Sequence, residues 1–211
     1  MTELDYIRDP DEIYRRSFQL IDEESDLSGL PEWLHPLAIR MIHACGMPDI
    51  VADLRWRGDP AQAARGALAG GAPVIVDARM VEAGLIRRTP PPGYRVICSV
   101  HDRETADLAR DLGTTRSAAA VDRWGESLAG SVAVIGNAPT ALFRLIERLS
   151  DAGFPRPAAL LAFPVGFVGA ADSKEALVAS RIDVPFLTLL GRRGGSALAA
   201  AALNGILKEA S

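Results

Sequence analysis

Five short apolar segments of strand length alternate with helical segments from residue 72 to the end of the chain. Each is nearly free of charge and is followed by a stretch with helical spacing. Strands that are apolar throughout are typical of parallel sheets covered by helices on both faces, because neither side meets water. We therefore predict an α/β fold with an open, mostly parallel five-stranded sheet and helices on both faces. The five predicted strands are 73–77, 96–100, 131–136, 158–163 and 184–191.

The first seventy residues follow a different pattern and predict a helical N-terminal section. Its first helix is expected to begin with Asp9 as N-cap and Pro10 in the first turn, and its second to end before Gly46. No internal repeat divides the chain, so residues 1–211 are predicted to form a single domain. The predicted elements of this section are helices over 10–24, 34–45 and 60–69 and a strand-like patch at 54–57.

The composition excludes several classes of protein. Hydrophobic residues make up 48% of the chain, which is too many for a disordered protein, and the net charge of −4 disfavours nucleic acid as a partner. The two cysteines are too few for a disulfide framework, and His43 and Cys45 point about 200° apart on one helix, so they cannot share a metal ion. Because the N-terminus is charged and has no apolar segment, we expect a cytoplasmic protein without membrane contacts.

Ligands of open parallel sheets bind beyond the carboxyl ends of the strands, so the segments after the predicted strands are candidate binding loops. The segment 136–142 places Asn137 before a helix start, where it either binds a ligand or shapes the turn. In the glycine-rich segment 163–177, Lys174 is expected in the first turn of a helix beginning near Asp172, a position that favours a nearby anion. The alternative is an ordinary solvated lysine.

Two further segments place arginine beside small residues. In GRRGG, Arg192 precedes Gly194 and Gly195, which combines a guanidinium fork with a backbone that a ligand can approach closely. In TTRSAAA, Arg116 and Ser117 lie at a predicted helix start. Plain turns with exposed arginines remain the alternative. These loops indicate binding of anionic oxygen atoms, yet the chain has no P-loop, no dinucleotide fingerprint and no nucleophile elbow.

The second predicted helix carries the strongest catalytic candidate. His43 lies nearly opposite the apolar stripe of that helix, and Arg40 shares its face, about 60° away. Ser17 lies on the apolar face of the first helix and either bonds to its own backbone or faces a ligand. Histidine transfers protons near neutral pH, so His43 is a candidate acid or base. A solvated Arg–His face is the alternative.

Several segments together resemble the precorrin-8X methylmutase (precorrin isomerase) family of cobalamin biosynthesis. They span nearly the whole chain, from about residue 6 to 207, and their combination is specific although no single segment is. The segments are YIRDPDEIYRRSF, IRMIHACG, TTRSAAA, GNAPTAL, PVGFVGAADSKEAL and GRRGGSALAAAALN.

The resemblance implies an α/β isomerase that moves a methyl group between neighbouring ring carbons of precorrin-8X, a formal 1,5-sigmatropic shift, to give hydrogenobyrinic acid. It implies no metal, nucleotide or redox cofactor, and a homodimer with the site near the interface. It places His43 as proton donor and acceptor, with Ser17 and Arg40 in contact with the substrate.

A tetrapyrrole with several carboxylates also explains anion-binding loops without a phosphate motif. We expect Arg40, Arg116, Lys174 and the turn 192–195 to hold carboxylates, and the loop 165–170 to pass against the flat ring. Three alternatives stay open: a cobalt-precorrin-8 methylmutase of the anaerobic pathway, a non-catalytic corrinoid carrier, and an enzyme acting on phosphate esters or nucleotides. The missing phosphate motifs speak against the third.

Overall fold

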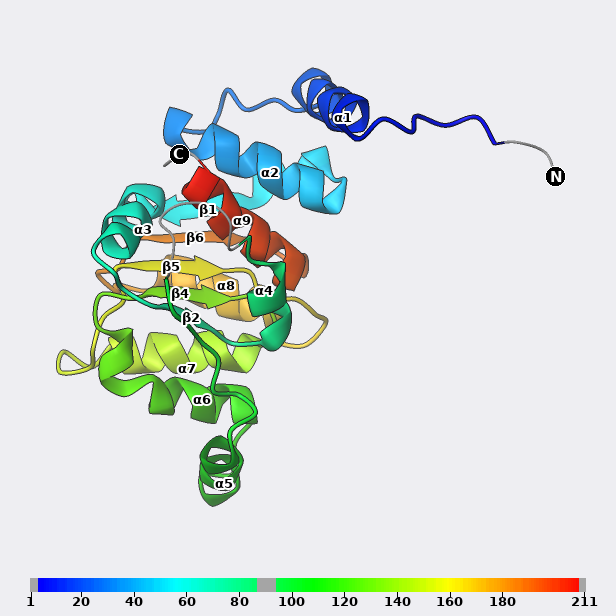
Figure 1. Cartoon of the computed structure of the whole chain (residues 1–211). Coiled ribbons are helices and arrows are strands. Elements are labelled where there is room, and N and C mark those ends of the chain that lie inside the picture. Colours follow the sequence, from blue (N-terminus) through cyan, green and yellow to red (C-terminus); the bar gives the residue numbers. More distant parts are fainter. Residues whose placement is uncertain (1–3, 87–93, 209–211) are drawn as a thin grey trace.

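The computed structural model describes residues 4–86 and 94–208, and it has one mixed sheet between layers of helices (Figure 1). In the described residues the sheet has six strands in the order β1-β6-β5-β4-β2-β3. All neighbours pair in parallel except β1, which is antiparallel to β6. The strands are β1 (Leu54–Arg57), β2 (Val74–Val76), β3 (Val96–Ile97), β4 (Val132–Ile135), β5 (Ala159–Ala162) and β6 (Phe186–Leu189).

The five predicted strands are confirmed as the parallel part of the sheet, but the predicted total of five is wrong. The patch at 54–57 forms the sixth strand, at the edge beyond β6, with Leu54 opposite Leu189. Only Leu54 of this strand is buried, and the other three residues are partly or fully exposed. A single buried side chain in a four-residue edge strand gives a weak sequence signal.

The helices cover both faces of the sheet, as predicted. On one face, α3, α4 and α9 enclose a core with β2, β4, β5 and β6, and α2 packs on the outer side of α9 (Figure 1). On the other face, α6, α7 and α8 enclose a second core, and α5 packs against α6. The α-helices are α1 (Pro10–Glu24), α2 (His35–Cys45), α3 (Pro60–Ala69), α4 (Arg79–Gly84), α5 (Arg103–Asp111), α6 (Arg116–Trp124), α7 (Pro139–Leu149), α8 (Ala170–Ala179) and α9 (Ser196–Lys208).

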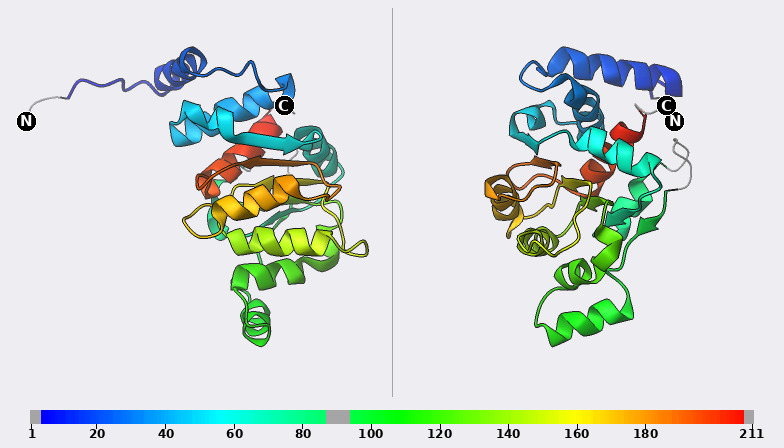
Figure 2. Two further views of the ribbon diagram at one scale, coloured as in Figure 1. Left: turned by 180° about the vertical axis from the view of Figure 1, so that it is seen from behind. Right: turned by 90° about the vertical axis from the view of Figure 1, so that its left-hand side faces the viewer.

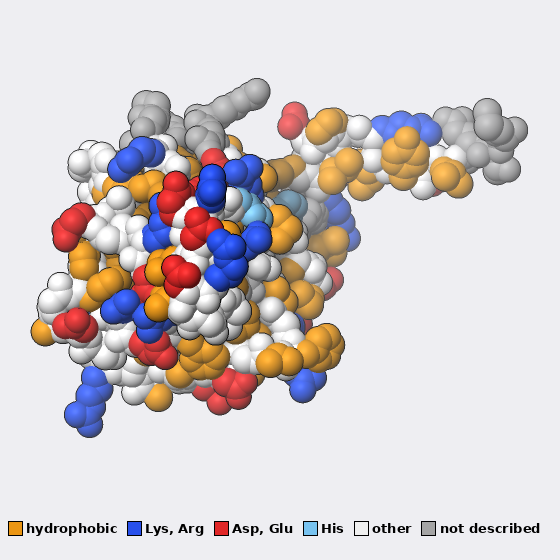
Figure 3. Space-filling model, turned by 90° about the horizontal axis from the view of Figure 1, so that it is seen from below, with side chains coloured by type: hydrophobic (Ala, Val, Ile, Leu, Met, Phe, Trp, Pro, Cys, Tyr) orange, Lys and Arg blue, Asp and Glu red, His pale blue; other side chains and the backbone are white. Residues whose placement is uncertain are grey.

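The N-terminal arm and α1 stand off from this body. Figure 2 shows α1 lying across α2, with the preceding residues extending away from the sheet. The predicted cap is confirmed, because the Asp9 carboxylate accepts the N–H of Asp11 at 3.0 Å. Only Ile21 of α1 is buried, whereas Leu4 and Tyr6 in the arm are 74% and 63% exposed. Hydrophobic side chains run along the projecting part of the chain in the space-filling view (Figure 3).

No helix within residues 4–86 and 94–208 is long and apolar enough to cross a membrane.

Candidate functional site

The packing of α2 on α9 decides which way His43 points. Leu37, Ala38 and Met41 are fully buried on the inner side of α2, whereas His43 is exposed on the outer side, as its spacing predicts. The close approach of the two helices depends on Gly205 of α9, where a Cβ atom would lie 3.4 Å from Leu37. The outer side of α2 faces α1, so the histidine lies between two helices.

Ser17 and His43 meet across this contact. Ser17 Oγ of α1 lies 2.8 Å from His43 Nδ1 of α2, and the Phe18 ring stacks on the imidazole with the ring centroids 5.1 Å apart. The hydroxyl donates to Nδ1 when that nitrogen carries no proton, and its oxygen accepts Nδ1–H when the nitrogen is protonated, as it is in the imidazolium form. Two contacts from α1 thus hold the ring, and Nε2 is the atom left for proton transfer.

Arg40, Tyr14 and Lys208 form a positively charged group beside the imidazole. Tyr14 Oη accepts hydrogen bonds from Lys208 Nζ at 3.0 Å and from Arg40 at 3.4 Å. The Lys208 hydrogen bond lowers the pKa of Tyr14, helped by the charge of Arg40, and partial burial opposes it. Among the described residues, no ion pair joins Arg40 to an acidic side chain. Arg40 therefore keeps donors for a ligand carboxylate.

Two cavities that share Arg40 line up along this surface. One, of about 260 Å³, is lined by Arg40 and His43 with small residues of α9, and the other, of about 360 Å³, by Phe18, Arg40 and Lys208 with the start of α2. We give the name imidazole groove to these two cavities together with Tyr14 and Ser17, the residues of α1 that bond to Arg40 and His43. Its central residues are Tyr14, Ser17, Phe18, Arg40, His43 and Lys208. It joins one proton-transfer group to an apolar surface and to cations.

A larger hollow of about 850 Å³ lies elsewhere, between the α1–α2 connection, the short helix η2 (Pro48–Asp53) and β1. Its lining includes Glu24, Asp26 and Asp49 but no histidine, cysteine or lysine. Size alone makes it the first place to look for a ligand. We place the site in the groove because His43 lies there beside Arg40, which has no acidic partner among the described residues, whereas three carboxylates line the hollow and would repel an anionic ligand.

The turn after β4 does not offer its backbone to a ligand, contrary to expectation. The buried Asp77, which follows β2, accepts the N–H groups of Gly136, Asn137 and Ala138 at 2.8, 3.0 and 2.7 Å. Burial raises the pKa of Asp77, while the three hydrogen bonds oppose that rise. The side chain of Asn137 remains exposed, so of this turn only that amide is free for the predicted contact.

Lys174 is also placed differently from expectation. Helix α8 begins at Ala170 after Gly169, not near Asp172, so Lys174 is beyond the first turn and fully buried. Its ammonium group donates to the carbonyl oxygens of Pro164 at 3.0 Å and Arg193 at 2.6 Å. Burial lowers the pKa of Lys174 to about 8, and the charge of Asp53 opposes this. The Lys174 side chain is therefore not placed to contact a ligand carboxylate directly.

The turn between β6 and α9 keeps one of its two arginines for a ligand. Arg193 bonds to Asp49 at 2.5 Å and to Asp53 at 2.6 Å, so its charge is compensated. Arg192 is exposed and lies over the Phe167 ring, 5.2 Å from its centroid. Gly194 and Gly195 are half-buried against the preceding turn. Arg192 is therefore the arginine of this turn that is available to bind a carboxylate, as predicted for the turn.

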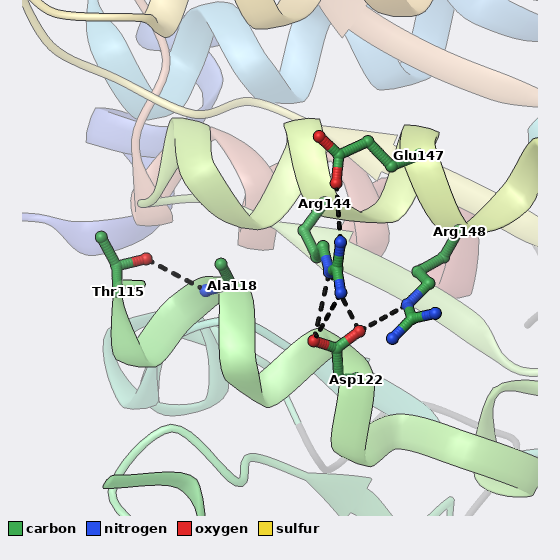
Figure 4. Close-up of polar contacts among 6 residues, drawn as sticks. All are labelled: Thr115, Ala118, Asp122, Arg144, Glu147 and Arg148. Atoms are coloured by element: carbon green, nitrogen blue, oxygen red, sulfur yellow. Dashed lines mark hydrogen bonds and ion pairs between the residues drawn. The ribbon is translucent and has the colours of Figure 1, made fainter. Parts of the chain in front are cut away.

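Arg116 and Ser117 lie on the opposite face of the sheet from α2. They begin α6, where Thr115 Oγ1 caps the N–H of Ala118 at 3.1 Å (Figure 4). Asp122 ties α6 to α7 through Arg144 and Arg148 (Figure 4). Arg116 is exposed, but no described contact brings it to α1 or α2. One chain thus unites Ser17, Arg40 and His43 but leaves Arg116 and Ser117 apart from them.

Three residues of these sites were not singled out from the sequence. Tyr14 lies one turn before Ser17, and a pattern of aromatic residues at 14 and 18 was the signal available for it. Asp77 ends an otherwise apolar strand, which is a recognisable position for a polar residue at a sheet edge. Lys208 gives no local signal. Among the described residues, no three histidine, cysteine or acidic side chains converge as a metal site would require.

Comparison with known proteins gives consistent matches over nearly the whole chain. Residues 12–209 match the family model of precorrin-8X methylmutase. The chain is 55% identical over 206 residues to precorrin-8X methylmutase of Pseudomonas aeruginosa, covering 98% of this chain and 99% of that protein. It is 35% identical over 198 residues to cobalt-precorrin-8 methylmutase of Priestia megaterium, covering 93% and 87%. The crystal structure of precorrin-8X methyl mutase from Thermus thermophilus superposes with a TM-score of 0.83 at 33% identity, covering 94% of this chain and 96% of that one.

Proposed function

The chain belongs to the precorrin-8X methylmutase family, and on this premise we propose that it converts precorrin-8X to hydrogenobyrinic acid with His43 as the proton donor and acceptor. It is an isomerase of cobalamin biosynthesis that catalyses methyl migration. The observation that carries the assignment of the acid is the Ser17–His43 contact of 2.8 Å in a groove that also holds Arg40.

The reaction leaves atoms and charge unchanged overall, so a proton that the protein lends to the ring must be returned to it. The imidazolium form of His43 gives its Nε2 proton to the ring system and is left as a neutral imidazole with its proton on Nδ1; the protonated ring draws electrons from the bond to the migrating methyl group and weakens it. The methyl group then bonds to the neighbouring carbon, and the ring returns the proton to His43. Ser17 keeps the ring oriented throughout, because its hydroxyl oxygen accepts the Nδ1–H group of both the imidazolium and the neutral imidazole.

The carboxylates of the substrate bind to the cations that keep free donors. Arg40 lies beside His43 and is not paired with an acid in the described residues. Arg192 and the amide of Asn137 are exposed at the carboxyl ends of the strands, and the loop 165–170 carries Phe167 next to Arg192. Charge-assisted hydrogen bonds from such groups fix the ring periphery and so decide which carbon the methyl group can reach.

A second copy of the chain completes the site in this proposal. Helix α1 buries only Ile21 within its own chain and leaves Ile13 49% exposed, which is unusual for a helix that carries site residues. Arg116 and Ser117 begin α6, which packs on the other face of the sheet from α2 and α9. A homodimer would cover the apolar arm and could bring these two residues of the partner to the substrate.

Two finer assignments complete the proposal. We assign the metal-free substrate, because identity to the Pseudomonas aeruginosa enzyme (55%) exceeds identity to the cobalt-precorrin-8 relative (35%). Competition between metal-free and cobalt-containing substrates tests this, and a preference for the cobalt form would overturn it. We assign the cytoplasm as the location, where both half-buried cysteines would stay reduced.

The decisive experiment compares the parent with His43→Ala on purified precorrin-8X, followed by the absorbance change of the ring. His43 is exposed, so the variant should fold like the parent, which circular dichroism checks. We expect kcat to fall about a thousandfold, within the range for loss of a general acid. Conversion at the parental rate would contradict the role of His43. Binding without conversion by the parent would instead identify a corrinoid carrier.

A further inference from the structure

We propose that Lys174 is a positioning residue for this reaction: it joins the two turns that follow β5 and β6, and through them sets the walls of the imidazole groove. The inference rests on the proposed function, because it concerns how the same groove is held in shape. We call Lys174 with its acceptors, the carbonyl groups of Pro164 and Arg193, the lysine clamp.

The ammonium group of the lysine clamp is buried, so it bonds to its two carbonyl acceptors away from solvent. Lys174 is fully buried, and its Nζ lies 3.0 Å from Pro164 O and 2.6 Å from Arg193 O. A buried ammonium group is costly unless its donors are used, so an apolar side chain at this place would be the cheaper choice for packing alone. The two carbonyl groups come from turns 29 residues apart in the chain, and the lysine joins them.

Backbone hydrogen bonds also hold these two turns at a fixed distance from each other. Gly195 N donates to Phe163 O at 2.8 Å, and Gly166 N donates to Arg192 O at 3.2 Å. At Gly194 a Cβ atom would lie 2.4 Å from Phe163 O, closer than any side chain can come. The turns therefore meet backbone to backbone, and the ammonium group satisfies carbonyls that this approach leaves buried.

The clamp connects to both walls of the groove. On one side, the guanidinium group of Arg193 bonds to Asp49 and Asp53 of η2, which follows directly on the helix that carries His43. On the other side, the same turn runs into α9, whose Ala197 and Ala200 line the cavity that contains His43. A shift of this turn would therefore move α9 relative to α2.

The clamp also fixes the loop that presents the exposed cation. Arg192 immediately precedes the clamped carbonyl, and its guanidinium group lies over Phe167 of the loop that starts at Pro164. Preorganised donors bind a rigid ligand with a smaller loss of entropy than mobile ones. Loss of the clamp should weaken substrate binding more than it slows the proton transfer at His43.

The test compares Lys174→Met with a matched control, Thr188→Val. Both substitutions nearly keep side-chain size and remove buried hydrogen bonds at the same end of the sheet: two at Lys174, and at Thr188 the bond from Oγ1 to Ala162 O at 2.6 Å. Of these two side chains, only Lys174 joins the turns that follow β5 and β6. We expect Lys174→Met to raise KM for precorrin-8X about tenfold with kcat within about threefold of the parent, and Thr188→Val to leave KM unchanged. Parental KM in Lys174→Met, or the same rise in Thr188→Val, would overturn the proposal.

A second variant keeps the test decisive if Lys174→Met does not fold. Arg193 is half-buried, and Arg193→Gln removes its ion pairs with Asp49 and Asp53 of η2. The KM of this variant for precorrin-8X should rise about fivefold. In the double variant the two effects on KM should combine to less than their product, because they act on one clamp. An unchanged KM in Arg193→Gln, or full multiplication in the double variant, contradicts the proposal. Failure of the parent to convert precorrin-8X would instead reject the proposed function.

Discussion

The imidazole groove and the turns after β4, β5 and β6 are both rich in hydrogen-bond donors, but they use them differently. In the groove, Arg40 keeps donors that no described acidic side chain occupies, and His43 keeps Nε2. In the turns, Asp77 occupies three backbone N–H groups and Lys174 occupies two carbonyl groups. A loop that resembles a ligand site can thus have its backbone hydrogen-bonding groups occupied by the protein's own side chains. Donors that have no partner inside the protein are the better guide to a site.

The difference has a physical origin in burial. The turns lie against the sheet core, where an unpaired N–H or carbonyl group costs about 1–3 kcal/mol, so each must find an internal partner. The groove lies between α1, α2 and α9 at the surface, where water can serve unpaired groups in the absence of a ligand. Four predictions test this contrast, ordered by the size of the expected effect in free energy.

The largest effect is expected at Asp77 in the turns. Asp77→Ala leaves three buried N–H groups without an acceptor, so the free energy of unfolding should fall by about 3 kcal/mol. Asp77→Asn keeps an acceptor oxygen and should cost less. Urea unfolding measures both. The folded enzyme should keep its kcat, and a selective loss of kcat at full stability would place Asp77 in the chemistry instead.

Removing the charge of Arg40 in the groove should weaken substrate binding without loss of stability. Arg40→Gln should raise KM about thirtyfold, equivalent to about 2 kcal/mol for a lost charge-assisted hydrogen bond. Arg181→Gln, at an exposed arginine between α8 and β6, is the control and should leave KM unchanged. Steady-state kinetics on precorrin-8X decides. If Arg40→Gln mainly unfolds the protein, the groove is a structural contact between helices.

Variants of Ser17 distinguish two possible roles of this side chain: orienting the imidazole of His43, or contacting the substrate. Ser17→Ala removes the partner of His43 Nδ1, so kcat should fall about tenfold, or about 1.4 kcal/mol, with little change in KM. Ser17→Thr keeps the hydroxyl and should restore much of the rate. A rise in KM at constant kcat would show the opposite, that Ser17 touches the substrate and does not orient the histidine.

The smallest effect concerns the pH dependence of stability at Lys174. Its pKa is about 8 in the folded protein against an ordinary 10.5, so the unfolded chain binds more protons between these values. Stability therefore rises with pH across this window, and the part of the rise between pH 8 and pH 9 is roughly 1 kcal/mol. A neutral amine still has two N–H groups for two carbonyls. The parent minus Lys174→Met difference in unfolding free energy should increase from pH 8 to 9, and a decrease would contradict the assigned shift.

The sequence predicted what depends on local periodicity. Uniformly apolar strands gave the parallel sheet, and the helical repeat placed Arg40 and His43 on one outward face of α2. The strand-like patch at 54–57 was predicted, but its place as the edge strand β1 of the sheet was not, because only Leu54 is buried in it. Each of these outcomes follows from side chains a few residues apart.

What the sequence could not predict depends on contacts between distant segments. Ser17 and His43 are 26 residues apart, and their contact requires the crossing of α1 over α2. The burial of Lys174 follows from the approach of Pro164 and Arg193, made possible by Gly194, and no periodicity encodes it. Which donors are already satisfied is a property of the folded chain.

The most direct test of the account is a structure of the protein with hydrogenobyrinic acid bound. We predict that a ring atom lies within hydrogen-bond reach of His43 Nε2, about 3 Å, and that a carboxylate of the ligand contacts Arg40. A ligand seated instead in the hollow beside Trp56, with His43 beyond the reach of proton transfer, would contradict the assignment of the imidazole groove as the active site.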